Sequence, residues 1–137
     1  VLTENKKGLA NAEKLKIPNH EHMVGEFSTM YMSRNRKKNW TEPSFTIQAG
    51  ARHIPLHPKA NSMIKIGSDQ WKFDEKDKNN YRRLSVRECA RIQTFPDSFI
   101  FKYNNIADGY KMIGNAVPVK LSEIIAKKIY KDLIKII

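Results

Sequence analysis

The chain has 137 residues, of which 40% are hydrophobic and 28% are charged, and this balance fits one globular domain and excludes an intrinsically disordered chain. Its 25 Lys and Arg residues outnumber its 14 Asp and Glu residues, and the net charge of +11 favours a polyanionic partner such as nucleic acid. Cys89 is the only cysteine, which excludes an intramolecular disulfide and a multi-cysteine zinc site and is typical of a reducing compartment, so we expect a cytoplasmic protein.

Neither end of the sequence predicts a membrane segment. No charged and apolar leader opens the chain, and the most apolar stretch, residues 121–137, contains four lysines that a bilayer core would not accommodate. The chain begins with Val1 rather than Met, and its first 16 residues show no clear apolar period. We therefore expect that it begins inside a longer natural sequence.

The first half of the chain predicts two short strands separated by a basic cluster. Residues 27–32 alternate in polarity well enough for a short strand, and residues 44–49 alternate as a half-buried strand does. A glycine and two prolines then predict a turn and a loop. The basic cluster between the two strands contains Arg34, Arg36, Lys37 and Lys38.

The middle of the chain predicts a β-hairpin. Residues 63–66 and 70–73 are typical of two strands joined by a three-residue connection. The charged residues 74–80 that follow predict a solvated loop.

Two helices are predicted in the last third of the chain. Ser85 and Glu88 form the capping-box pattern that begins a helix, which we expect to run over residues 86–94. A second helix is predicted from near Pro118, because apolar residues from Leu121 onward recur at spacings of three and four with lysines opposite them.

The histidines and the cysteine are weak candidates for chemistry. Cys89 lies one turn into an amphipathic helix, where a cysteine is most often a small buried hydrophobic residue. His20 and His22 are two residues apart, but no further cysteine or acidic residue follows at ligand spacing, and His53 and His57 are equally weak alone. We therefore predict no catalytic residue and no metal site.

Three arginines are better candidates, for contacts with DNA bases. A guanidinium can donate two parallel hydrogen bonds to O6 and N7 of guanine, which lysine cannot reproduce. Arg34 and Arg36 project together from an extended segment, and Arg52 lies in the turn after the second predicted strand. Lys37 and Lys38 are expected to hold phosphates. A run of charge is also typical of a solvated surface, so charge alone leaves both interpretations open.

Two long motifs resemble a known family. Residues 81–97 (YRRLSVRECARIQTFPD) and 109–119 (GYKMIGNAVPV) resemble, nearly residue for residue, the ninth and tenth conserved motifs of DNA cytosine C5 methyltransferases. Upstream, the residues around Arg34, Trp40 and the second predicted strand resemble the target-recognition region of the bacterial enzymes that methylate GGCC. Arg34, Arg36 and Arg52 match arginines that this resemblance implies to contact guanines from the major groove.

The motifs that perform the chemistry in this family are absent from the sequence. The family attacks cytosine with the cysteine of a Pro-Cys pair, assists with a Glu-Asn-Val triplet and binds S-adenosylmethionine on a Phe-x-Gly-x-Gly turn, and none of these occurs here. The Gln-x-Arg-x-Arg motif is absent too. The resemblance thus implies the C-terminal part of such an enzyme, a split subunit or a fragment, which is inactive without an N-terminal catalytic half.

The resemblance also implies roles for two groups of residues near the C-terminus. Asn115, Ala116 and Val117 are implied to line the methionine end of S-adenosylmethionine, while the residues themselves predict a tight turn that caps the last helix; both interpretations can hold. The ninth motif is implied to organise the recognition region rather than to perform chemistry, and its residues expected to be structural are Arg87, Glu88 and Arg91.

The expected fold is mixed α and β, with a small irregular β-rich recognition region and C-terminal helices that complete the α/β (Rossmann-like) S-adenosylmethionine-dependent methyltransferase fold. Residues 1–80 are expected to form the target-recognition region, residues 81–107 the motif-nine helix and its connection, and residues 108–137 the motif-ten turn and a C-terminal helix that packs on the catalytic domain.

The function expected from the resemblance is that of a DNA (cytosine-5-)-methyltransferase of a restriction-modification system, with double-stranded DNA and the N-terminal half as partners and no membrane. Two other classes stay open. A stand-alone DNA-binding module without catalysis would fit the charge and the recognition motifs. A generic basic RNA-binding protein would explain the charge but not the two long motifs.

Overall fold

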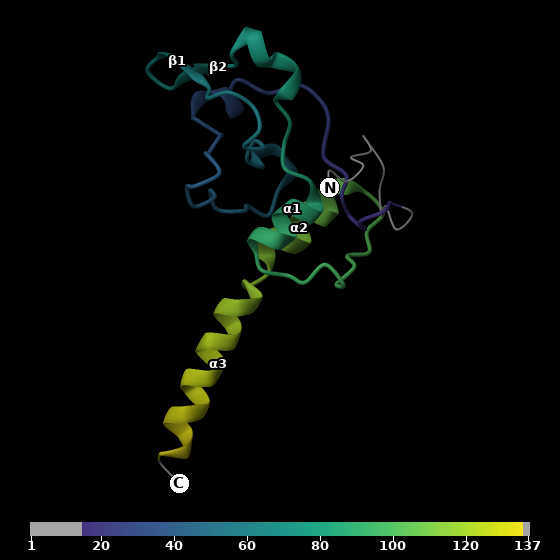
Figure 1. Ribbon diagram of the computed structural model, residues 1–137, viewed down its shortest axis with the longest axis vertical. Coiled ribbons are helices and arrows are strands. Elements are labelled where there is room, and N and C mark those ends of the chain that lie inside the picture. The colour runs from purple at the N-terminus through teal and green to yellow at the C-terminus, as the bar shows by residue number, and fades with distance from the viewer. Residues whose placement is uncertain (1–14, 136–137) are drawn as a thin grey trace.

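In the computed structural model, which describes residues 15–135, two helices lie at the base of a largely irregular body and a hairpin lies at its opposite end (Figure 1). A third helix projects away from this body. Strand β1 (Ile64–Gly67) pairs antiparallel with β2 (Gln70–Lys72) in the only sheet of the described residues. The mixed α and β composition is confirmed, but the expectation of a β-rich recognition region is wrong.

The predicted hairpin is confirmed, with a shorter connection than expected. Ile64 lies opposite Lys72, and the two strands are joined by Ser68 and Asp69 alone. Asp69 has a φ of 52°, in the left-handed region that Asp tolerates better than most residues. The charged segment after the hairpin is not a loop but a 3-10 helix, η3 (Glu75–Asn80), whose first turn is capped by the side chain of Asp74.

The strand predicted over residues 27–32 is wrong. Ser28 closes a local turn, because its hydroxyl accepts a hydrogen bond from the Tyr31 amide (3.2 Å) and its carbonyl accepts one from the Met32 amide (3.0 Å). The chain continues as the 3-10 helix η1 (Tyr31–Ser33), which buries the Tyr31 ring completely. Local hydrogen bonding by serine therefore replaces a strand here.

The strand predicted over residues 44–49 is also wrong, although part of its burial pattern is present. Ile47 is 4% exposed and Phe45 is half-buried, whereas Ala49 is exposed. No strand in the described part of the chain pairs with this segment. The backbone of Gln48 and Ala49 instead packs closely against Gly114.

Helix α1 (Val86–Ile92) confirms the predicted capping box. The Ser85 hydroxyl accepts from the Glu88 amide, and the Glu88 carboxylate accepts from the Ser85 amide at 2.7 Å. The helix ends two residues earlier than predicted. Thr94 has a φ of 60°, so the chain leaves the helix through a left-handed residue, a conformation that commonly ends helices.

Helix α2 (Ile106–Asn115) was not predicted from the sequence, and it ends where the tight turn before the last helix is expected. The side chain of Asn105 caps its first turn by accepting from the Asp108 amide. Two glycines make the segment a poor helix former by itself. Both are in tight contacts, because a Cβ at Gly109 would lie 2.7 Å from the Tyr103 ring and one at Gly114 would lie 2.4 Å from backbone atoms of residues 48 and 49.

Helix α3 (Val119–Ile134) begins immediately after Pro118, as predicted. Its first turn is held to the end of α1 by two hydrogen bonds, from the Val119 amide to the Gln93 carbonyl (3.1 Å) and from the Lys120 amide to the Thr94 hydroxyl (2.9 Å). None of its residues is buried, and Figure 1 shows it standing clear of the body. No helix within residues 15–135 is long and apolar enough to cross a bilayer.

Two hydrophobic clusters hold the body together. The larger cluster joins α1 and α2 to the segments on either side of them, and the smaller one lies beneath the hairpin. The residues of the larger cluster are Ile47, Ala51, Ile54, Leu84, Val86, Cys89, Ala90, Phe101, Tyr103, Tyr110 and Ile113. Those of the smaller cluster are Tyr31, Leu56, Ala60, Met63 and Tyr81.

Candidate nucleic-acid interface

The basic cluster lies on an extended segment that is anchored by backbone pairing. Lys37 forms a parallel bridge with Leu56, and Leu56 forms an antiparallel bridge with Arg83 just before α1. The Leu56 amide donates to the Arg36 carbonyl at 2.8 Å. The backbone that carries the predicted site is therefore tied to the base of the body.

Arg34 and Arg36 differ in how firmly they are held. Arg34 is exposed, and its guanidinium has no partner among the described residues. Arg36 is half-buried: its Nε donates to the Tyr31 carbonyl at 3.0 Å, and its guanidinium lies 5.1 Å from the centre of the Tyr31 ring. These contacts fix the plane of the Arg36 guanidinium, while Arg34 is free to turn.

Arg52 is presented by the 3-10 helix η2 (Ala51–His53). The residues on either side of it, Ala51 and Ile54, are buried in the larger cluster, at 7% and 0% exposure. Arg52 itself is exposed and has no partner within the part of the chain that the structure describes. The turn thus pins the backbone while it directs this guanidinium to solvent.

Two neighbouring surface depressions bring the three predicted arginines together. One, of about 200 Å³, is lined by Arg34 and Arg36, and the other, of about 580 Å³, is lined by Arg52. Gln48 and His53 line both. Arg34 and Arg52 are 18 positions apart in the sequence, but the depressions that they line have a shared wall, formed by Gln48 and His53.

The two lysines of the cluster are placed differently. Lys37 is 8% exposed, and its ammonium donates to the Asn39 side chain at 2.8 Å. Lys38 is more open: its ammonium pairs with Glu42 at 3.1 Å and lies 5.0 Å from the centre of the Phe45 ring. The position of Lys38 suits a phosphate contact, whereas the burial of Lys37 suits a structural role.

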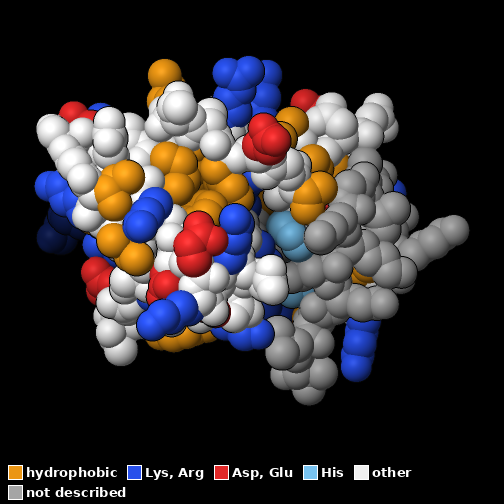
Figure 2. Space-filling view, turned by 90° about the horizontal axis from the view of Figure 1, so that it is seen from above, with side chains coloured by type: hydrophobic (Ala, Val, Ile, Leu, Met, Phe, Trp, Pro, Cys, Tyr) orange, Lys and Arg blue, Asp and Glu red, His pale blue; other side chains and the backbone are white. Residues whose placement is uncertain are grey.

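Basic side chains are spread over the hairpin end of the molecule rather than gathered into one patch. Figure 2 shows Lys and Arg side chains around most of this face, with hydrophobic side chains exposed among them. A field of this kind attracts a polyanion without fixing its position. The distribution of charge alone therefore singles out no one position on this face.

The residues predicted to contact the cofactor lie at the end of α2 and the start of its connection to α3. Asn115 and Val117 are exposed, Val117 at 59%, and Ala116 is half-buried. Gly114, just before them, packs on the backbone of Gln48 and Ala49, so this turn lies next to the wall that the three arginines share.

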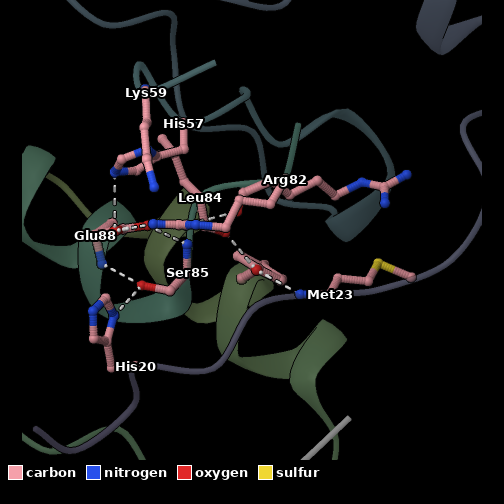
Figure 3. Close-up of polar contacts among 10 residues, drawn as sticks. His20, Met23, His57, Lys59, Arg82, Leu84, Ser85 and Glu88 are labelled. Atoms are coloured by element: carbon pink, nitrogen blue, oxygen red, sulfur yellow. Dashed lines mark hydrogen bonds and ion pairs between the residues drawn. The ribbon is translucent and has the colours of Figure 1, made fainter. Parts of the chain in front are cut away.

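A polar network that sequence reasoning missed joins His20, His57 and Arg82 to the start of α1. The Glu88 carboxylate accepts two hydrogen bonds from Arg82, at 2.7 and 2.8 Å, and lies 3.5 Å from Nε2 of His57 (Figure 3). On the other side, the Ser85 hydroxyl contacts Nδ1 of His20 at 2.7 Å. The capping box revealed the bonds between Ser85 and Glu88, but nothing in the sequence indicated the histidines.

Burial and charge shift the pKa values of this network in opposite directions. Burial alone would raise the pKa of Glu88, but the hydrogen bonds and charge of Arg82 prevail and hold it at about 2. Burial lowers the pKa of both His20 and His57, and the Arg82 charge lowers them further. The network therefore contains an ionised carboxylate, an arginine and two histidines that favour the neutral form.

His57 also borders an apolar groove of about 540 Å³ between the basic cluster and α1. Trp40, which is 72% exposed, stands at this groove with its ring edge-on to His57, 5.2 Å between ring centres. Phe45 and Pro55 line this groove and the smaller arginine depression alike. The groove thus adjoins the predicted site, with Phe45 and Pro55 between them.

Arg87 has a structural role, as expected for the ninth motif. It is fully buried, and it donates to the carbonyls of Pro18, Pro96 and Phe99 and to the side chain of Asn19. Arg91 forms an exposed pair with Asp97 at 2.6 Å. These contacts hold the segments before and after α1 in place.

The remaining candidates for chemistry are placed as follows. Cys89 is fully buried, and burial raises the pKa of its thiol, so the interpretation as a small buried hydrophobic residue is confirmed. His20 and His22 are buried in the body. Across residues 15–135, no group of three or more His, Cys, Asp or Glu side chains is arranged to hold a metal ion.

One protein family matches nearly the whole chain: residues 3–131 match the family described as C-5 cytosine-specific DNA methylase. The chain is 65% identical over 127 residues to type II methyltransferase M.MthTI of Methanothermobacter thermautotrophicus, and 54% identical over 127 residues to type II methyltransferase M.FnuDI of Fusobacterium nucleatum. It is 51% identical over 117 residues to type II methyltransferase M.BsuRI of Bacillus subtilis.

These similarities cover far more of this chain than of the relatives. The alignments include 93%, 93% and 79% of the chain, but 38%, 37% and 27% of M.MthTI, M.FnuDI and M.BsuRI respectively. The chain thus spans less than two fifths of the length of the curated relatives that it matches.

Proposed function

Because the chain belongs to the C-5 cytosine-specific DNA methylase family, we propose that it is the recognition and closing part of a DNA (cytosine-5-)-methyltransferase of a type II restriction-modification system, with GGCC as its target. The arrangement of Arg34, Arg36 and Arg52 around the shared wall of Gln48 and His53 carries this proposal. Three guanidinium groups on anchored backbone suit the guanine edges of a duplex in the major groove.

The three arginines and the two lysines have different roles in DNA binding. Arg34 and Arg52, whose guanidinium groups have no partner in the described part of the chain, adapt to base edges, and Arg36 presents a guanidinium already oriented by Tyr31. Lys38 holds a phosphate. Lys37, bound to Asn39, adds charge near the duplex without a direct contact.

Asn115, Ala116 and Val117 form one wall of the S-adenosylmethionine site, and the rest of that site belongs to the catalytic half. S-adenosylmethionine supplies the methyl group when it is bound. This chain positions the wall, because the tight contact of Gly114 with the backbone of residues 48 and 49 holds the end of α2 beside the recognition segment. Cys89 takes no part, since its thiol is buried away from any substrate.

The exposed helix α3 is the contact with the catalytic half. Its apolar side chains are between 38% and 67% exposed, although they recur at the spacing of a buried helix face. In this proposal they pack on the α/β domain that carries the Pro-Cys, Glu-Asn-Val and Phe-x-Gly-x-Gly motifs. The target cytosine must leave the duplex to reach that domain.

The test compares variants of the three arginines with a variant of Lys38. Arg34→Ala, Arg36→Ala or Arg52→Ala should weaken binding to a GGCC duplex by about 1 to 3 kcal/mol and binding to a scrambled duplex much less. Lys38→Ala should weaken both duplexes equally and lower the slope of log affinity against log salt by about one, because a phosphate contact releases a counterion and carries no base information. The measurement is a binding titration of both duplexes across a salt series.

Equal losses on both duplexes for the arginine variants would show that these side chains hold phosphates and would refute the site assignment. A separate assay addresses catalysis: methyl transfer from labelled S-adenosylmethionine to DNA is expected only after the catalytic half is added. Activity of the chain alone would refute the proposed division. A chain that binds GGCC but never supports methylation with that half would instead be a stand-alone DNA-binding module.

A further inference from the structure

Gln48 has an exposed side chain at the centre of the proposed interface. It lines both the depression that contains Arg34 and Arg36 and the one that contains Arg52. No other residue of the described chain makes a hydrogen bond to its side-chain amide. His53 is the only other side chain that the two depressions share.

The backbone of Gln48 is held from two sides. Its carbonyl accepts a hydrogen bond from the Gly50 amide at 2.8 Å. On the other side α2 approaches so closely that a Cβ at Gly114 would lie 2.4 Å from the carbonyl carbon and 2.5 Å from the carbonyl oxygen of Gln48. The Gln48 amide therefore extends from a fixed backbone, and its hydrogen-bonding atoms are available to a ligand.

The charged side chains around Gln48 cannot accept a hydrogen bond from the exocyclic amine of cytosine. Arginines only donate hydrogen bonds, so Arg34, Arg36 and Arg52 can bind the acceptors O6 and N7 of guanine but not the exocyclic amine of cytosine. Among the residues that the structure places along either depression, none is Asp or Glu. An acceptor for cytosine must therefore come from a neutral side chain.

Gln48 and His53 are the neutral side chains that border both depressions, and Gln48 is the more exposed of the two. The Asn35 side-chain oxygen already accepts from the Lys37 amide at 3.0 Å, and Thr46 has a short side chain and borders only the smaller depression. The Gln48 amide has both an acceptor and a donor, so it can accept from cytosine N4 and donate to guanine O6 of the same base pair.

We propose that Gln48 is a specificity-determining residue that recognises the cytosine edge of a G·C pair next to the guanines bound by the arginines. The inference rests on the proposed DNA-recognition function and deepens it. Three arginines bind at most three guanines, and a target of four G·C pairs such as GGCC presents four. Gln48 contacts the fourth G·C pair, which no arginine binds.

The experiment selects bound duplexes from a pool with a randomised central segment and compares their sequences for the 137-residue chain and its variants. Gln48→Met, which keeps the length of the side chain and removes its polar atoms, should lose a cytosine preference at one position by roughly fivefold or more. Gln48→Glu keeps the acceptor, so it should retain that preference while all duplexes bind more weakly. Gln70→Met, at an exposed glutamine on β2, is the matched control and should select the same sequences as the wild type.

Three outcomes would contradict the inference, and they are distinguishable. If the wild-type chain selects no sequence, the proposed recognition function fails and the inference fails with it. If the wild type selects a guanine- and cytosine-containing site and Gln48→Met selects the same site, only the role of Gln48 is refuted. If Gln48→Glu loses the cytosine preference while it still binds DNA, the contact is not made through an acceptor. Gln48→Ala repeats the test without a long side chain, and thermal unfolding verifies that each variant is folded.

Discussion

The carboxylate of Glu88 ties three segments of the chain together. It completes the capping box of α1 through the Ser85 amide, holds Arg82 by two hydrogen bonds and lies beside His57 at the apolar groove. Its side chain is 16% exposed, so little solvent competes with these partners. The carboxylate is fully effective only while it is ionised.

Acid should therefore destabilise the protein through Glu88. The pKa of Glu88 is about 2 in the folded protein and near 4.5 when the chain is unfolded, so its contribution is complete above pH 4.5 and is lost as the pH falls toward 2. The loss amounts to about 3 kcal/mol over that range. His20 and His57 act at higher pH, because their lowered pKa values make the unfolded state bind protons first as the pH falls through 6.5. Urea unfolding between pH 7 and pH 3 measures both effects.

A matched pair of variants isolates the carboxylate. Glu88→Gln should be less stable at pH 7 and should lose most of the change in unfolding free energy below pH 4.5. Glu75→Gln removes a carboxylate that is 72% exposed and paired with Lys78 at 3.4 Å, so its pH profile should follow that of the wild type. An unchanged profile for folded Glu88→Gln would mean that other groups govern the acid sensitivity.

Elements whose signals are local could be predicted from the sequence, and those that depend on partners could not. The capping box begins α1 where predicted, and the hairpin and the start of α3 follow from alternation and from Pro118. The segment of residues 44–49 has a strand pattern, yet it packs on α2 and finds no strand to pair with. The three arginines were identified from chemistry and resemblance, whereas Gln48 and the histidine network depend on contacts between distant segments.

Helix α2 shows how tertiary contacts override propensity. Its two glycines disfavour a helix, and only the Asn105 cap with Asp108 three residues later could have indicated one in the sequence. The glycines are present because no side chain fits: the Tyr103 ring occupies the space beside Gly109, and the backbone of residues 48 and 49 occupies that beside Gly114. Packing, rather than helix formation, selects these residues.

Gly114→Ala should accordingly destabilise the protein. Alanine favours a helix by about 1 kcal/mol over glycine, but its Cβ would meet backbone atoms at 2.4 Å, and we expect a net loss of about 1 to 3 kcal/mol. Gly50→Ala is the control, because no atom lies within 4 Å of a Cβ there and its φ is −170°. Thermal unfolding measures both variants. If Gly114→Ala were as stable as Gly50→Ala, α2 would have to shift away easily. The proposed link between the cofactor wall at the end of α2 and the wall that the three arginines share would then fail.

At the level of the whole molecule, the described residues 15–135 form a body with two hydrophobic clusters and a helix that has no buried residue. Both hydrophobic clusters are closed by residues of the body, whereas α3 buries none of its side chains. An exposed apolar face of this size is typical of an interaction surface. No described residue outside α3 covers this face enough to bury any of its side chains.

The chain should therefore associate through α3. We expect self-association of the isolated chain in light scattering at high concentration, and a gain in thermal stability when the catalytic half is added. Leu121→Asp and Ile125→Asp should prevent both, because each places a charge in the apolar contact. Lys131→Asp, on the lysine-rich face of the same helix, should leave association intact. A monomeric wild-type chain that gains no stability would contradict the role given to α3.

The joint between the body and α3 has a mechanical consequence. Only a short connection and two hydrogen bonds, at Gln93 and Thr94, set the direction of a helix of 16 residues. Such a helix is about 24 Å long, so a tilt of about 10° at the joint displaces its far end by about 4 Å. If a partner holds α3 in place, the same tilt moves the body instead. The guanidinium groups of Arg34, Arg36 and Arg52 then move with the body. Substitution of Thr94 removes one of the two hydrogen bonds at this joint, so it should change the angle between α3 and the body while it leaves every side chain proposed to contact DNA in place.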